Sequence, residues 1–101
     1  MANERMTADD RTAQLVQAGY TIARTKGIKK VTRAAVARET GVSVTLINRY
    51  LDGREGLRGA VLARAVELKD AATLAAAGEF YELPVGSMPR ALEREVRNLS
   101  R

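Results

Sequence analysis

The sequence predicts an all-α fold, and three observations support that prediction. Apolar residues recur three or four positions apart through most of the 101-residue chain, which is the period of one helix face. Glycine and proline separate these periodic stretches. Residues that favour helix starts, Thr32 and Ser43, precede two of them. We therefore expect a three-helix bundle, extended by a long fourth helix and a short C-terminal helix.

The first helix is predicted to end at Gly27, after a flexible N-terminus over residues 1–8. Asp9 and Asp10 suit a helix start, where acidic side chains interact favourably with the helix dipole. The helix carries apolar pairs, namely Leu15, Val16, Ala18, Ile22 and Ala23. We assign residues 1–62 to one domain that contains this helix and the two that follow.

Residues 32–51 predict a helix, a tight turn at Gly41 and a second short helix. Glycine accepts the left-handed conformation that ends a helix, because it has no Cβ to clash. Ser43 then stands where a hydroxyl can accept from free backbone N–H groups at the next helix start, and Thr32 does the same for the preceding helix. Two capped helices separated by two or three residues have the layout of a helix-turn-helix DNA-binding unit.

The second helix of this unit has one apolar face and one polar face. At about 100° per residue, Leu46, Ile47, Tyr50 and Leu51 share the core arc, whereas the outward arc comprises Val44, Thr45, Asn48 and Arg49. Arginine, asparagine and threonine side chains can recognise base edges, and valine can contact a thymine methyl group. On an isolated surface helix these positions would simply be solvated, but within this motif we favour the DNA-reading interpretation.

Residues 11–62 resemble the N-terminal DNA-binding domain of the tetracycline-repressor (TetR) family. The resemblance rests on Gly27, on Thr32 with Val36 and Ala37, on Gly41-Val42-Ser43, and on the later Arg54-Glu55-x-Leu57. It implies that Thr32 and Arg33 contact phosphates or a base, that Val44, Thr45 and Leu46 face the groove, that Tyr50 reaches a phosphate, and that Arg54 binds a phosphate. The chain departs from the family pattern at Leu46, Asn48 and Tyr50, and the helical wheel places Leu46 partly inward.

Charge is unevenly distributed along the chain. The net charge is +5, and six basic residues with no acid lie between Arg24 and Arg38. Basic side chains beside a recognition helix can bind the phosphate backbone, so we expect Lys29 and Lys30 to contact DNA irrespective of sequence. The alternative, a solvated loop whose cations suit the C-terminus of the first helix, accounts for Lys26 but not for the whole cluster.

Several classes of function are excluded by composition. The chain has no cysteine and no histidine, so thiolate sites, imidazole bases and disulfides are absent. The acidic pairs Asp9 with Asp10 and Glu79 with Glu82 fit a helix start and a loop, and no phosphate-binding glycine loop occurs. We expect neither catalysis nor a metal or cofactor. Without a long apolar run or a secretory signal, we expect a cytoplasmic location and no membrane partner.

Chain length bears on regulation. A chain of 101 residues forms one small core that leaves little room for a large ligand cavity. Full-length members of the TetR family continue into a helical domain that binds ligands and forms dimers, and this chain stops where that domain would begin. We therefore expect no small-molecule effector unless a second protein supplies the sensing.

The C-terminal half, residues 54–101, is predicted to be a dimerisation region. Residues 54–77 read as one long helix that ends at Gly78, with an alanine-rich second half. Pro84, Gly86 and Pro89 then interrupt the pattern, with Ser87 as a candidate cap. Residues 90–99 read as a short helix that must pack on its own chain or on a second subunit. Since helix-turn-helix proteins usually read two half-sites, we expect a homodimer.

Two functions from different classes follow from these features. The first is a sequence-specific, ligand-independent transcriptional regulator, most simply a repressor that binds double-stranded DNA at an inverted repeat. The alternative is a protein-interaction module that docks on a polymerase or larger regulator through its C-terminal helices. From residue 54 onward the chain has eight basic and seven acidic residues, whereas residues 1–53 have nine basic and five acidic residues. The excess positive charge therefore lies in the half that is expected to bind DNA.

Overall fold

The computed structural model describes residues 6–100, and within them every regular element is helical, which confirms the all-α prediction. The α-helices are α1 (Ala8–Lys26), α2 (Arg33–Thr40), α3 (Val44–Leu51), α4 (Gly53–Glu67), α5 (Ala71–Ala77) and α6 (Arg90–Leu99). Two short 3-10 helices, η1 (Ile28–Lys30) and η2 (Val85–Ser87), lie in the connections.

The N-terminus was expected to be flexible over residues 1–8, of which residues 1–5 lie outside the described part of the chain. The side chain of Thr7 accepts a hydrogen bond from the backbone N–H of Asp10 at 3.0 Å. Helix α1 therefore begins, with a cap, inside the range that was expected to be flexible.

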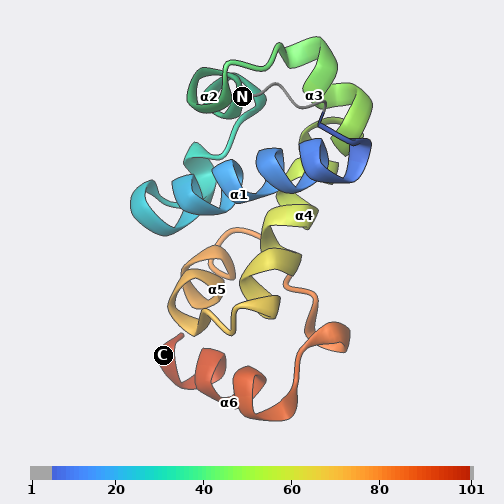
Figure 1. Ribbon diagram of the computed structural model, residues 1–101. Coiled ribbons are helices and arrows are strands. Elements are labelled where there is room, and N and C mark those ends of the chain that lie inside the picture. Colours follow the sequence, from blue (N-terminus) through green and yellow to red (C-terminus); the bar gives the residue numbers. More distant parts are fainter. Residues whose placement is uncertain (1–5, 101) are drawn as a thin grey trace.

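The molecule is elongated, with principal extents of 45 × 21 × 21 Å. Helices α1, α2 and α3 lie at one end, α5 and α6 lie at the other, and α4 runs between the two groups (Figure 1). A single apolar core continues through both groups and includes Leu15 of α1, Ile47 of α3, Leu57 of α4 and Leu74 of α5.

Helix α4 packs closely across α1. Gly19 of α1 makes this approach possible, because a Cβ at that position would lie 2.7 Å from Cγ2 of Val61 and 3.4 Å from Cδ1 of Leu57. Val61 and Leu57 are both fully buried. The α1 and α4 backbones are therefore held at a separation that no larger side chain at residue 19 would allow without a shift.

The prediction of one long helix over residues 54–77 is wrong, because the chain turns at residues 68–70 and a separate helix, α5, begins at Ala71. Lys69 adopts a left-handed conformation with φ 55°. Asp70 then caps α5: its Oδ1 accepts from the backbone N–H of Thr73 at 3.1 Å, and its Oδ2 accepts from the Thr73 hydroxyl at 2.7 Å. Alanine favours helix strongly, but these interactions outweigh its local preference.

A contact with α1 stabilises this break. The hydroxyl of Tyr20, a buried residue of α1, donates a hydrogen bond of 2.5 Å to Oδ2 of Asp70. Burial pushes the pKa of the Asp70 carboxyl upward, but the hydrogen bonds from Tyr20 and Thr73, together with the positive charge of Arg24, leave that pKa below its ordinary value. Burial and the nearby carboxylate raise the pKa of Tyr20, which therefore remains a donor.

The C-terminal helix α6 spans residues 90–99, as predicted, and Leu92 and Val96 are buried. It follows Pro89 directly, whereas the candidate cap Ser87 lies in η2. Helix α6 packs on α5 of the same chain. The apolar stripe of α6 comprises Leu92, Val96 and Leu99, of which only Leu99 is exposed, at 54%. This stripe and the alanine-rich helix belong to the region that the sequence interpretation assigned to dimerisation, and both are thus largely used within the chain.

Candidate nucleic-acid interface

The turn between α2 and α3 has the geometry that the sequence predicts. Gly41 is left-handed at φ 76° and ψ 8°, and its N–H donates to the carbonyl of Ala37 at 2.8 Å. The Ser43 hydroxyl accepts from the backbone N–H of Leu46 at 3.2 Å, and the Thr32 hydroxyl accepts from that of Ala35 at 3.0 Å. Both predicted caps are confirmed, so the helix-turn-helix corner is closed by local hydrogen bonds at both helix starts.

Helix α3 presents most of its outward arc to solvent. Ser43, Thr45 and Arg49 are exposed, and Val44 is 39% exposed although it is apolar. On the opposite arc Ile47 and Leu51 are buried, as the helical wheel predicts. Leu46 and Tyr50 are half-buried and pack against the core, in agreement with the wheel. The exposed set is therefore available to a groove of nucleic acid.

Asn48 is less accessible than its predicted position on the outward arc implies. It is half-buried, and its Oδ1 accepts a hydrogen bond of 2.9 Å from Nη1 of Arg33, which is half-buried as well. The helical wheel gives the direction of Asn48 but not its partner, which lies 15 residues earlier. This bond links the first residue of α2 to the middle of α3.

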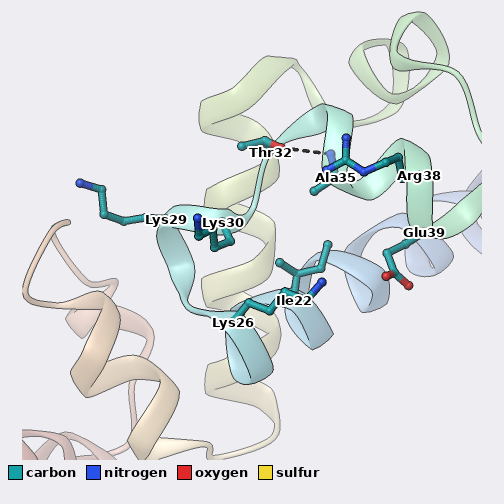
Figure 2. Close-up of a pocket in the computed structure, with 8 residues that line it drawn as sticks. All are labelled: Ile22, Lys26, Lys29, Lys30, Thr32, Ala35, Arg38 and Glu39. Carbon is teal, nitrogen blue, oxygen red and sulfur yellow. Dashed lines mark hydrogen bonds between the residues drawn. The ribbon is translucent and has the colours of Figure 1, made fainter.

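Basic side chains from three elements line a groove of about 510 Å³ beside α2. They are Lys26 at the end of α1, Lys29 and Lys30 of η1, and Arg38 of α2 (Figure 2). Glu39 is the one acidic residue on the lining, and Figure 2 shows it at the end of the groove away from Lys29. The folded chain thus brings together four of the six basic residues that the sequence places between Arg24 and Arg38.

A second groove, of about 240 Å³, adjoins the first, because Lys29 and Thr32 line both. Its other polar lining residues are Arg54, Arg58 and Tyr81. Arg54, which the TetR resemblance implies as a phosphate ligand, therefore lies near Thr32 and Lys29. Sequence reasoning missed Arg58 and Tyr81, and the only sequence signal for Arg58 is its position one helical turn after Arg54.

The cations of both grooves carry no carboxylate partner among residues 6–100. Ion pairs in this part of the chain are limited to Arg64 with Glu67 and Arg97 with Glu93, each at 3.1 Å. Neither pair involves a residue of the two grooves. Ion pairing within the described part of the chain therefore does not neutralise the positive charge beside the helix-turn-helix, which can attract a polyanion.

Over residues 6–100, no group of three or more acidic side chains is arranged to hold a metal ion. No helix in that range combines the length and the apolar character that crossing a membrane requires.

Comparison with known proteins adds no relative: no protein-family model, no curated protein and no solved structure matches this chain.

Proposed function

We propose that the chain is a sequence-specific DNA-binding regulator that places the exposed face of α3 in the major groove. The capped turn at Gly41 and the outward positions of Thr45 and Arg49 carry this proposal. A helix presented at such a corner fits a groove of duplex DNA, and an arginine on it can make a bidentate contact with guanine. Val44 adds an apolar contact of the kind that a thymine methyl group accepts.

The flanking charge supports the same partner. Lys29, Lys30 and Thr32 lie beside the start of α2, and Arg33 at that start is hydrogen-bonded to Asn48 on α3. A contact between the DNA phosphate backbone and the start of α2 is therefore connected, through the hydrogen bond from Arg33 to Asn48, to the helix that would read the bases. Such contacts fix the register of a protein on the duplex without carrying sequence information.

The regulator is further proposed to act as a cytoplasmic repressor that occludes a promoter, without a small-molecule effector. Two copies would occupy an inverted repeat, since helix-turn-helix proteins usually read half-sites about one DNA turn apart. Sedimentation analysis of the purified chain with and without duplex tests this assembly. One chain per duplex at saturating protein would contradict the homodimer.

In vitro selection from a random duplex library tests the proposed function. The purified chain should enrich a short motif over successive rounds, and a mobility shift should then confirm binding to the recovered site. An Arg49→Ala variant carried through the same rounds should enrich a more degenerate motif, because it lacks the side chain suited to guanine. Recovery of no motif by the unaltered chain would refute sequence-specific reading.

A second candidate, a protein-interaction module, is favoured by one observation. Phe80, Val85 and Leu99 in the C-terminal part are large apolar residues with more than half of their surface exposed. Exposed apolar side chains mark protein interfaces where they form one contiguous patch. Recovery of a stoichiometric protein partner by the tagged chain, together with no shift of any duplex, would select this candidate over the DNA-binding regulator.

A further inference from the structure

Three cations from two separate parts of the chain converge on one groove. Lys29 comes from η1, whereas Arg54 and Arg58 come from the first turns of α4. Like charges that share a groove repel one another, so the arrangement is unfavourable unless the groove binds an anion or another interaction compensates. As described above, no carboxylate within residues 6–100 pairs with any of the three.

Aromatic rings hold two of these cations in place. The guanidinium carbon of Arg58 lies 4.0 Å from the centre of the Tyr81 ring, and Nζ of Lys29 lies 4.8 Å from the centre of the Phe80 ring. Both rings belong to the segment after α5, and their centres are 6.5 Å apart. A segment outside the helix-turn-helix therefore positions two charges beside it.

Stacking on an aromatic ring leaves a guanidinium able to bind an anion. The ring attracts the face of the guanidinium plane, whereas the five N–H donors point outward within that plane. A carboxylate partner would occupy those donors, but a tyrosine ring does not. The Tyr81 contact thus restricts the motion of Arg58 without using its hydrogen bonds, which reduces the entropy lost when an anion binds.

We infer that Arg58, held on Tyr81, is a further phosphate contact and that it forms with Lys29 and Arg54 a pocket for one phosphate of the DNA backbone. This inference rests on the proposed function. The pocket is connected to the reading helix through neighbouring residues, because Thr32 on its lining precedes Arg33, which is hydrogen-bonded to Asn48 of α3. Tyr81 is a positioning residue that acts through Arg58, and it extends the DNA interface beyond residue 62.

A purely structural role for the same contacts makes a different prediction. If Arg58 and Tyr81 only attach the segment after α5 to the bundle, their loss would lower stability but would not alter how DNA affinity depends on salt. If Arg58 neutralises a phosphate, its loss must reduce the number of counterions that binding releases. The salt dependence of affinity therefore separates the two roles.

The test measures affinity for one fixed duplex over a range of salt concentrations. Arg58→Ala should weaken binding several-fold at low salt and reduce the slope of log affinity against log salt by about 0.9, the value for one phosphate contact. Arg94→Ala, which removes an exposed arginine on α6, is the matched control for net charge and should leave the slope unchanged.

Tyr81 variants test the positioning role. Tyr81→Leu should weaken binding about two- to five-fold, in line with the strength of an exposed cation–π contact, whereas Tyr81→Phe keeps the ring and should bind as the unaltered chain does. In an Arg58→Ala background, Tyr81→Leu should cause no additional loss of affinity. Circular dichroism on every variant confirms that the helices are retained.

The outcomes separate the inference from the proposed function. If the unaltered chain binds no duplex at any salt concentration, the proposed function fails and the inference fails with it. If the unaltered chain binds and Arg58→Ala keeps its slope, only the inference is overturned. A loss in slope with Arg94→Ala equal to that with Arg58→Ala would also overturn it, because the effect would then reflect net charge alone.

Discussion

Replacing Asp70 with alanine should destabilise the fold more than a substitution at a half-buried position usually does. The substitution removes the cap of α5, which is worth about 1 kcal/mol. It also leaves the buried Tyr20 hydroxyl without its acceptor, which costs about 1–3 kcal/mol. We expect the two effects together to lower the free energy of unfolding by about 2–4 kcal/mol. Urea unfolding followed by circular dichroism measures this change.

Two variants divide the effect of Asp70 into its parts. Tyr20→Phe removes only the hydrogen bond to α1 and should cost about 1–2 kcal/mol. Asp70→Asn keeps a carbonyl that can cap α5 but loses the negative charge, and should cost less than Asp70→Ala. An Asp70→Ala variant within about 0.5 kcal/mol of the unaltered chain would refute the account of the break between α4 and α5.

The charge of Asp70 also predicts how stability depends on pH. Since the pKa of the folded carboxyl is depressed, the unfolded chain takes up the proton first as the pH falls. The stabilisation is therefore complete above the unfolded pKa of about 3.9, and it is lost as the pH falls through the lower folded pKa. Asp70→Asn should remove this part of the acid sensitivity. Equal acid profiles for the two proteins would contradict the depressed pKa.

Three further predictions concern the packing of α1 on α4, the turn at Gly41 and the contacts with the DNA phosphate backbone. Urea titration should show that Gly19→Ala lowers the free energy of unfolding by about 1–3 kcal/mol, because the added Cβ clashes with Val61. The control Gly59→Ala, whose Cβ would meet nothing within 4 Å, should raise the free energy of unfolding by about 0.5–1 kcal/mol. Gly41→Ala should cost about 1–2 kcal/mol because φ is positive there, and unchanged stability would contradict the left-handed conformation of residue 41. Lys30→Ala should weaken binding of all duplexes alike and lower the salt slope by about 0.9, and a sequence-dependent loss would contradict a backbone role.

Features determined by neighbouring residues were predictable from the sequence. The caps at Thr32 and Ser43 and the left-handed Gly41 depend on side chains and backbone within four residues, so composition and spacing were sufficient. The last helix was bounded correctly because Pro89 precedes it and its apolar stripe has the helical period. The exposure of Thr45 and Arg49 followed from the same periodicity.

Features that depend on distant residues were not predictable in this way. The break at Lys69 carries no glycine or proline, and it is stabilised by Tyr20, which lies 50 residues before Asp70. In hindsight, Asp70 followed three residues later by Thr73 was a local sign of a helix start, although the alanine run hid it. The hydrogen bond from Arg33 to Asn48 has no periodic signature, because periodicity gives the direction of a side chain and not its partner.

The cation–π contact between Arg58 and Tyr81 belongs to the same class of contact. Arg58 lies on α4, whereas Tyr81 lies in the loop after α5. The chain turns back between α4 and α5, and one continuous helix over residues 54–77 would have kept Arg58 and Tyr81 apart. The extent of the basic surface therefore emerges only with the fold, although most of its charge was visible in the sequence.

The central claim is that α3 reads base edges while the basic flank binds the backbone. The most direct test is the ratio of affinities for the selected site and for a scrambled duplex of equal length, measured at one salt concentration. Arg49→Ala should reduce this ratio by about 1–3 kcal/mol, or five- to more than a hundredfold, whereas Lys30→Ala should lower both affinities and keep the ratio. An Arg49→Ala variant that retains the full ratio would contradict the claim.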